Sequence, residues 1–89
     1  MRTIIRKSRF KKDFKKLQSS GKDLEKLAEV LRLLQQGRKP PERYRDHNLT
    51  GNFSGCRECH ISPDWLLIYQ MTETELILVR TGSHSELFR

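Results

Sequence analysis

The sequence predicts one α+β domain, spanning residues 1–89, in which two N-terminal helices pack on a small twisted antiparallel sheet. Two observations lead to this fold class. The first half carries apolar residues at helical spacing in two segments, and the second half carries three apolar runs separated by short polar gaps. A domain of this length buries only about 60–65% of its unfolded surface, so we expect a shallow groove as the functional site.

The first segments predict a strand followed by a helix. Residues 2–7 alternate isoleucine with basic residues, a pattern typical of a strand at the edge of a sheet or next to it. Ser8 is the candidate N-cap of the helix, which is expected to end at residues 19–21, Ser-Ser-Gly. The apolar side chains of this helix fall at i, i+4 and i+7, with lysines on the other side: Phe10, Phe14 and Leu17.

A second helix is predicted from about Asp23 to Gln36. Gly37 closes it, and the prolines at 40 and 41 prevent its continuation. Its apolar stripe consists of Leu24, Leu27, Ala28, Leu31 and Leu34, and is widened by Val30 and Leu33. We expect the two helices to form a short antiparallel hairpin whose apolar stripes belong to the core.

Three strands are predicted for the rest of the chain, at residues 52–61, 65–71 and 75–81. The gaps between them are short, as in an antiparallel meander. The run from Trp65 to Tyr69 has no polar alternation, which predicts a central strand that is buried on both faces.

Charge is distributed unevenly along the chain, whose formal net charge is +7. Residues 1–46 contain 15 Lys or Arg and 6 Asp or Glu, whereas residues 47–89 contain 3 and 5. A basic surface attracts RNA or DNA through counterion release, although solvation of two helix faces explains the same lysines. No apolar stretch approaches the roughly 20 residues of a membrane-spanning helix, and no signal-peptide core is present, so we expect a cytoplasmic protein without membrane contact.

Cys56, Cys59 and His60 spell C-x-x-C-H, the attachment pattern of haem c. The pattern does not fit its context, because residues three apart on a strand point to opposite faces and cannot easily hold one cofactor. A closed zinc site needs four ligands, and a second C-x-x-C is absent from the sequence. We therefore predict two reduced thiols, no metal and no cofactor.

The second half also holds every histidine of the chain. Metal-free RNA cleavage uses the 2′-hydroxyl as nucleophile, so it needs a base, an acid for the 5′-oxygen and positive charge near the phosphorane. Histidine, with a reference pKa of about 6.5, can serve on either side of this proton exchange. The candidates for such chemistry are three imidazoles, one carboxylate and two aromatic rings: His47, His60, His84, Asp64, Trp65 and Phe88.

These residues lie in segments that carry a resemblance to a known family. The segments are residues 44–49 (YRDHNL), then Gly51, Gly55, Arg57 and His60, then residues 62–69 (SPDWLLIY) and 80–88 (RTGSHSELF). Their spacing, H-x12-H-x3-D-W-x18-H-x3-F, is far more specific than a single short motif. The chain resembles the YafQ-type toxins of the RelE superfamily over nearly its whole length, which implies a RelE-like toxin fold. Cys56 and Cys59 depart from that pattern but lie outside the implied catalytic set.

The resemblance implies the toxin half of a type II toxin–antitoxin system, a ribosome-dependent endoribonuclease that cuts messenger RNA. It implies four partners: a cognate acidic antitoxin, the ribosome, mRNA, and DNA only through the antitoxin complex. The first cleavage product is expected to be a 2′,3′-cyclic phosphate.

Roles for individual residues follow from the resemblance and from this chemistry. By resemblance, His84 is the general acid, on a flexible loop after the last strand, and His47 or Asp64 is the base. His60 is expected to orient the phosphate or a neighbouring catalytic group, and Arg80 to stabilise charge there. The expected substrate contacts are base stacking by Trp65 and Phe88, and phosphate binding by lysines of the two helices: Lys11, Lys12, Lys15, Lys16, Lys22 and Lys26.

Simpler interpretations remain open for several of these residues. Trp65 begins the most buried strand and fits core packing as well as stacking, Asp64 fits a turn, and Phe88 fits an anchor for the C-terminal segment. Two other functions are compatible with the composition. A non-catalytic toxin of the ParE type, which acts on a topoisomerase, would not require the histidines. A basic RNA-binding module would interleave aromatics with Lys or Arg on strands, whereas here the aromatics of the strand pattern lie in the acidic half.

Overall fold

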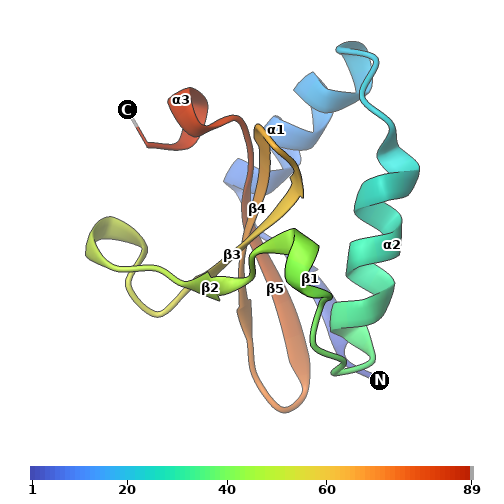
Figure 1. Ribbon diagram of the computed structural model, residues 1–89, viewed down its shortest axis with the longest axis vertical. Helices are drawn as coiled ribbons and strands as arrows, with labels where there is room; N and C mark the ends of the chain where they lie inside the picture. Colours follow the sequence, from blue (N-terminus) through green and yellow to red (C-terminus); the bar gives the residue numbers. More distant parts are fainter. Residues whose placement is uncertain (89) are drawn as a thin grey trace.

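Helices cover one face of a five-stranded sheet in the computed structural model, which describes residues 1–88. Figure 1 shows α2 on one side of the sheet, and α3 and the connection from β2 to β3 on the other. The strands are β1 (Thr3–Arg6), β2 (His47–Asn48), β3 (Arg57–Ser62), β4 (Trp65–Met71) and β5 (Glu75–Gly82), in the spatial order β1-β5-β4-β3-β2. The helices are α1 (Ser8–Ser19), α2 (Leu24–Gln35) and α3 (His84–Leu87), with 3₁₀ turns η1 (Glu42–Tyr44) and η2 (Gly51–Phe53).

The sheet is mixed, which corrects the prediction of a purely antiparallel one. β2–β3, β3–β4 and β4–β5 pair antiparallel as expected, but β1 pairs parallel to β5, from Thr3 opposite Glu75 to Arg6 opposite Leu78. Short turns join the last three strands, and a strand that follows a short turn must run antiparallel to the one before it. β1 is instead separated from the rest of the sheet by two helices, so no hairpin determines its direction. Its predicted position at the sheet edge is confirmed.

Both long helices lie within a residue or two of the predicted bounds. In α2, Asp23 is the N-cap, and its carboxylate accepts a hydrogen bond from the backbone N–H of Glu25. Gly37 follows with a left-handed φ of 75°, which ends the helix. In α1 the N-cap is Lys7 and not Ser8, and no side chain caps this end.

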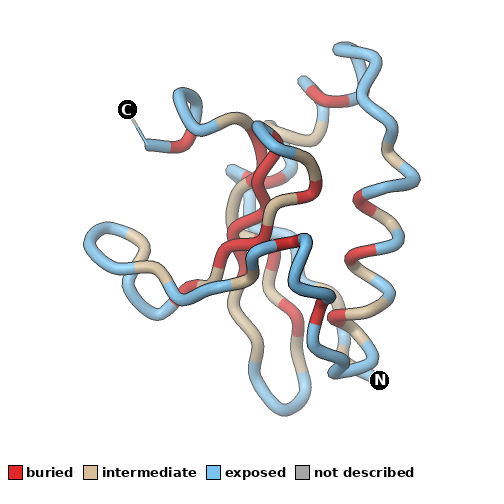
Figure 2. Tube along the Cα trace, viewed as in Figure 1, coloured by how far each residue is buried: buried red, intermediate tan, exposed pale blue. Residues whose placement is uncertain are grey.

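The core lies on both faces of β4, as predicted from its continuous apolar run (Figure 2). Leu67 and Tyr69 face the helices, whereas Leu66 and Ile68 face the smaller cluster under α3. The helices contribute their apolar stripes to the larger cluster, chiefly through Phe10, Leu17, Leu27, Val30 and Leu34.

The two cysteines belong to different clusters, so the prediction that they face opposite sides of the sheet is confirmed. Cys59 packs in the cluster on the helix side and Cys56 in the cluster under α3, and both are free thiols. Burial raises the pKa of Cys56 and raises that of Cys59 to about 12. Neither thiol is therefore a thiolate at neutral pH.

The segment before β3 differs from its prediction. A strand was expected to begin at residue 52, but residues 51–53 form η2 and β3 begins only at Arg57. Gly51 and Gly55 have left-handed φ angles of 68° and 88°, and these turns interrupt an extended chain. Within residues 1–88, no helix is both long enough and apolar enough to cross a bilayer.

Candidate active site

The three histidines lie in a row across one edge of the molecule. His47 lies on β2, His60 on β3 and His84 at the start of α3. The ring centroids of His47 and His60 are 6.1 Å apart, and those of His60 and His84 are 5.7 Å apart. His60 is the inner residue of the row, with a side chain only 14% exposed, whereas half or more of the His47 and His84 side chains is exposed. The fold thus brings together residues that are 37 positions apart in sequence.

A buried carboxylate lies under the first two histidines. Glu58 is only 3% exposed, and its Oε1 is 3.5 Å from Nε2 of His47 and 3.7 Å from Nε2 of His60. Sequence reasoning missed this residue. The signal that could have found it is the two-residue spacing of Glu58 and His60, which places both on one face of a strand. The Nδ1 atom of His60 is buried and has no hydrogen-bond partner in the part of the chain that the structure describes.

Asp64 holds His84 by two contacts. Its Oδ1 accepts from the backbone N–H of His84 at 3.1 Å and lies 3.2 Å from the ring Nδ1. Both contacts hold the pKa of Asp64 below its usual value, and the hydrogen bond from the His84 backbone has the larger effect. Asp64 is thus a carboxylate at neutral pH and orients His84, whereas the sequence prediction left it as an alternative base.

His84 is the first residue of a capped helix, so the expected flexible loop is wrong. The Ser83 hydroxyl accepts from the backbone N–H of Glu86, and the Glu86 carboxylate accepts from the backbone N–H of Ser83 at 2.8 Å. This reciprocal pair is a capping box. Leu87 anchors the helix in the apolar cluster under it. The position of His84 is therefore defined by local structure and packing.

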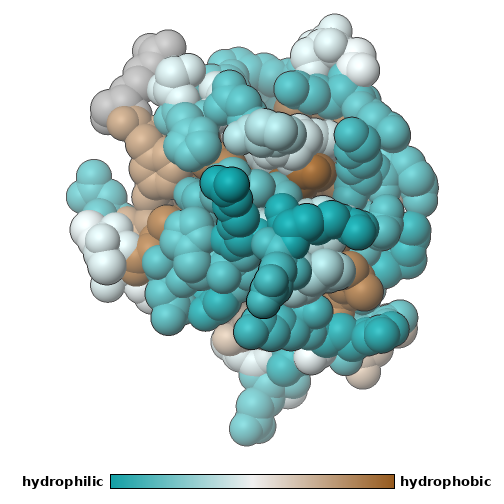
Figure 3. Space-filling model, in the orientation of Figure 1, coloured by the Kyte–Doolittle hydropathy of each residue, from teal (hydrophilic) through white to brown (hydrophobic). Residues whose placement is uncertain are grey.

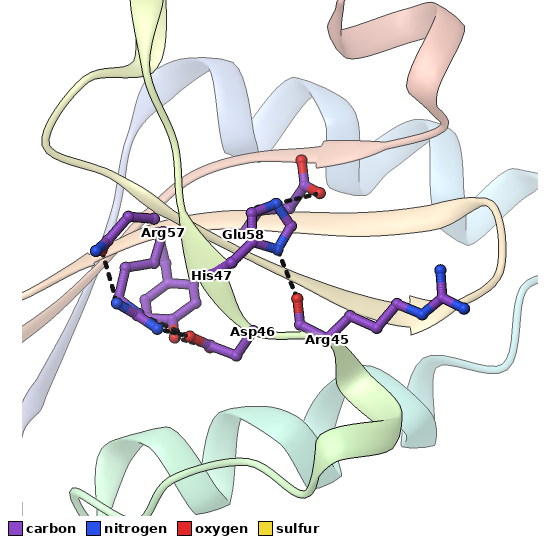
Figure 4. Close-up of polar contacts among 7 residues, drawn as sticks. Arg45, Asp46, His47, Arg57 and Glu58 are labelled. Atoms are coloured by element: carbon purple, nitrogen blue, oxygen red, sulfur yellow. Dashed lines mark hydrogen bonds and ion pairs between the residues drawn. The ribbon is translucent and has the colours of Figure 1, made fainter.

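His47 is held by the segment that precedes it (Figure 4). Its Nδ1 lies 2.7 Å from the carbonyl oxygen of Arg45. Because a carbonyl oxygen can only accept a hydrogen bond, Nδ1 must carry the hydrogen and donate it. Asp46 anchors the segment, because it accepts hydrogen bonds from the guanidinium of Arg57 and from the hydroxyl of Tyr69. Burial is the main cause that raises the pKa of Tyr69, and the hydrogen bond to Asp46 is the second. The phenol therefore remains a donor at neutral pH.

Aromatic rings continue the row of histidines beyond His84. The ring of Phe88 is 43% exposed and lies 6.2 Å from that of His84, centroid to centroid. Phe53 meets Phe88 edge to face at 5.7 Å. Figure 3 shows hydrophobic atoms gathered between α3 and the connection from β2 to β3, on a face that is otherwise mainly hydrophilic. The exposure of Phe88 leaves room for a base on its ring, and the stacking role stays a prediction.

Trp65 does not fit the stacking role that was expected of it. Only 2% of the residue is exposed, and it belongs to the core on the helix side. Its indole Nε1–H donates to the Thr81 hydroxyl at 3.0 Å, and the Lys22 ammonium lies 5.8 Å from the ring centroid. A base cannot reach a ring that is packed in this way. The other interpretation of Trp65, core packing, is the one that the structure supports.

Arg80 is paired with a carboxylate of α1, and the α1 lysines face solvent. The Arg80 guanidinium donates two hydrogen bonds to Asp13 on α1, at 2.7 and 3.1 Å, and both side chains are largely buried. Asp13 thus offsets the positive charge that was expected to act on the phosphate, and it accepts from two of the five N–H donors of the guanidinium. The lysines at 11, 12 and 15 are exposed on α1 and do not line the groove described next.

An open groove of about 630 Å³ begins at the histidines and extends toward α2. His60 and His84 line one part of it, and Lys26, Arg43 and Arg45 line another. This open shape agrees with the shallow groove that the length of the domain predicted. Glu58, His60 and His84 also place ligand atoms within 4.8 Å of one another, a donor set that could hold a transition metal.

Comparison with known proteins identifies the class of protein. A family model described as bacterial toxin of type II toxin-antitoxin system, YafQ, matches residues 2–89. The mRNA interferase toxin YafQ of Escherichia coli strain K12 is 41% identical over 88 residues, which cover 98% of this chain and 96% of that protein. The domain is thus a type II toxin with an α+β, RelE-like fold. It belongs to the YafQ family.

Solved structures agree with this assignment. The E. coli DinJ–YafQ complex contains a chain that matches with a TM-score of 0.91 and 39% identity, with full coverage of both chains. A metal-bound toxin from Helicobacter pylori matches with a TM-score of 0.92 and 46% identity, over 99% of this chain and 100% of the other.

Proposed function

We propose that this protein is an endoribonuclease that cleaves messenger RNA by metal-free attack of the 2′-hydroxyl on the adjacent phosphate. The observation that carries the proposal is the single row of His47, His60 and His84, with Asp64 on the last ring and an exposed aromatic ring, Phe88, beside it. The E. coli relative is named an mRNA interferase. A ParE-type toxin that does not cut RNA would have no use for this row.

His84 is the general acid of the proposed reaction. Because Nδ1 faces the Asp64 carboxylate, Nε2 is the atom that can reach a substrate. The charge of Asp64 stabilises the protonated ring, which then gives its proton to the 5′-oxygen as the bond from phosphorus to that oxygen breaks. Asp64 is engaged by the backbone N–H and the ring of His84 and is therefore less suited to accept the proton of the 2′-hydroxyl. His47 is the better candidate for the base.

His47 takes the proton from the 2′-hydroxyl while the oxygen attacks phosphorus. The products are a 2′,3′-cyclic phosphate and a free 5′-hydroxyl. His60, between the other two rings, is placed to contact the phosphate. Glu58 lies beside both His47 and His60, so its carboxylate stabilises the positive charge that His47 acquires. In this scheme Glu58 is a positioning residue and does not touch the substrate.

The ribosome and an antitoxin complete the proposal. The groove is open and the stacking surface small, so free single-stranded RNA is poorly ordered at the site, whereas the ribosome presents mRNA in a fixed conformation. The E. coli relative was solved with the antitoxin DinJ. A chain of net charge +7 is suited to an acidic antitoxin, through which any contact with DNA would be made.

The test compares one mRNA in two states, free and on translating ribosomes, with the purified toxin. Cleavage should be much faster on the ribosome, persist in EDTA and give fragments that end in a 2′,3′-cyclic phosphate by mass spectrometry. His84→Gln should lower the cleavage rate on the order of 10²–10⁴-fold. Equal rates on free and translated RNA would refute ribosome dependence alone, whereas loss of cleavage in EDTA would refute the metal-free mechanism.

The donor set of Glu58, His60 and His84 supports a second, inhibitory role for a bound metal. Carboxylate and imidazole ligands suit Zn²⁺ or Cu²⁺, and the H. pylori relative was solved with metal. A metal held by these residues would keep His84 from proton transfer and His60 from the phosphate, so added Zn²⁺ should inhibit cleavage and EDTA should restore it. Calorimetry should show weaker Zn²⁺ binding by Glu58→Gln. Undiminished binding by that variant would place the metal elsewhere.

A further inference from the structure

Arg45 has a backbone conformation that an arginine rarely adopts. Its φ and ψ are 47° and 45°, and among residues 1–88 it is the only non-glycine residue with positive φ. It ends η1, because its N–H donates to the carbonyl of Glu42 at 2.9 Å. The left-handed conformation is unfavourable for an L-residue with a side chain, and glycine or asparagine usually occupies such helix ends. Strained non-glycine residues cluster at functional sites, which makes the Arg45 side chain a candidate for a functional role.

The Arg45 side chain lies in the groove beside the histidines. Arg45 lines the groove together with His60 and His84. Its guanidinium has no hydrogen bond or ion pair within the described range, whereas the neighbouring Arg43 is 3.8 Å from Glu29 and donates to the Tyr44 hydroxyl. Figure 4 shows the Arg45 side chain directed away from the Asp46 and Arg57 pair. An uncompensated guanidinium in a groove is a ready site for a phosphate.

The backbone of the same residue contacts a catalytic candidate. The Arg45 carbonyl oxygen lies 2.7 Å from Nδ1 of His47. The left-handed turn therefore directs the carbonyl to His47 and the side chain into the groove. One residue connects orientation of the proposed base with a possible substrate contact.

We propose that Arg45 binds a phosphate of the RNA strand next to the scissile phosphate, with the strand lying along the groove between the histidines and Lys26. This inference rests on the proposed function and names a substrate contact for it. The groove is large enough for a nucleotide, since small-molecule sites span about 300–1,000 Å³. Arg45 takes the place of Arg80 as the cation near the histidines, because the Arg80 guanidinium is paired with Asp13.

Arg45→Gly is the sharpest test, because glycine favours the left-handed turn. The variant can keep the left-handed turn that directs the carbonyl, while it removes the whole side chain, including the guanidinium. Its Tm should equal or exceed that of the parent. Its affinity for a short 2′-O-methyl oligoribonucleotide of mixed sequence, which cannot be cleaved, should fall about fivefold. The slope of log affinity against log salt should decrease by about 0.7, the value for one phosphate contact on a single strand.

Two variants serve as controls in the same titrations. NMR spectra recorded at low salt are the readout. Arg45→Lys keeps the charge and should keep the salt slope. Arg38→Gly removes one positive charge from an exposed position outside the groove and should have little effect. An Arg45→Gly affinity equal to that of Arg38→Gly would overturn the proposal. So would a parent protein whose His60 and Arg45 signals do not move with the oligonucleotide.

Other outcomes separate this inference from the function on which it rests. If Arg45→Gly weakens binding to the antitoxin but not to the oligonucleotide, the groove is a protein contact and the proposal is wrong. If the oligonucleotide binds with the expected dependence on Arg45 but the parent cleaves no mRNA on the ribosome, the proposed function fails and the RNA site stands.

Discussion

One carboxylate oxygen of Asp64 lies 3.1 Å from the backbone nitrogen and 3.2 Å from the ring nitrogen Nδ1 of His84. The first contact places the start of α3, and the second orients the ring that the helix carries. Because both end on the same atom, the position of the helix and the orientation of the imidazole ring are coupled. This relationship gives Asp64 a role through His84 and not as an independent base.

Replacing either partner should reduce cleavage without unfolding the protein. His84→Gln removes the general acid and should lower the cleavage rate on the order of 10²–10⁴-fold. Asp64→Asn keeps an acceptor oxygen but loses the charge, so we expect a smaller loss, about tenfold or more. The ¹⁵N shifts of the His84 ring should change in Asp64→Asn. A folded His84→Gln variant that still cleaves at the parent rate would disprove the assignment.

Trp65→Phe should affect stability and leave the chemistry intact. It leaves a cavity in the core and removes the hydrogen bond to the Thr81 hydroxyl. Together these should lower the free energy of unfolding by about 2–3 kcal/mol, measured by urea denaturation. Cleavage by the folded variant should be unchanged at a temperature well below its Tm. A large loss of cleavage there would restore the stacking role.

Phe88→Leu should do the opposite. The ring is exposed and packs mainly against Phe53 and His84, so its loss should cost little stability. The free energy of substrate binding should become less favourable by about 1–3 kcal/mol, the range for stacking of one base on an aromatic ring. The effect should appear in KM for ribosome-bound message. If KM is unchanged while Tm falls, Phe88 serves only as an anchor.

The capping box of α3 predicts a specific pH dependence of stability. Hydrogen bonds from the Ser83 backbone, followed by its side chain, hold the pKa of Glu86 below its ordinary value of 4.5. A carboxyl whose pKa is lowered on folding contributes stability that is fully present above its unfolded pKa. This contribution is lost as pH falls through the folded pKa. Parent and Glu86→Gln should therefore differ in unfolding free energy at pH 6, and the difference should shrink below about pH 4.5.

Glu73→Gln is the matched control for this measurement, since Glu73 is exposed in the turn before β5 and caps no helix. A difference between parent and Glu86→Gln that persists unchanged to pH 2 would show that the capping contribution does not depend on the charge.

Association with the antitoxin should depend on salt. Opposite net charges steer two proteins together, and screening shortens the range of this attraction to about 8 Å at physiological ionic strength. Stopped-flow experiments should show an association rate that falls as salt rises, with a dissociation rate that changes much less. An association rate that is indifferent to salt would mean that inhibition depends on shape and apolar contact alone.

Elements with a strong local pattern were determined by the sequence alone. The apolar stripe of α2 and its Asp23 cap, the fully apolar run of β4 and the opposite faces of Cys56 and Cys59 follow from the periods of helix and strand. The spacing of the three histidines also pointed to one site. Such features depend on residues close in sequence, or on a pattern that a single chain displays.

Only the tertiary structure decided the features that depend on distant partners. β1 pairs with β5 across 72 positions, from Thr3 to Glu75, and Asp13 neutralises Arg80 across 67 positions. The burial of Glu58 beside His47, 11 positions away, depends on the pairing of β2 with β3. Trp65 shows the same limit, because its start-of-strand position fits both stacking and the core until its neighbours are known. A side chain acquires its exposure and charge environment from whatever packs against it, and local periodicity carries no information about those contacts.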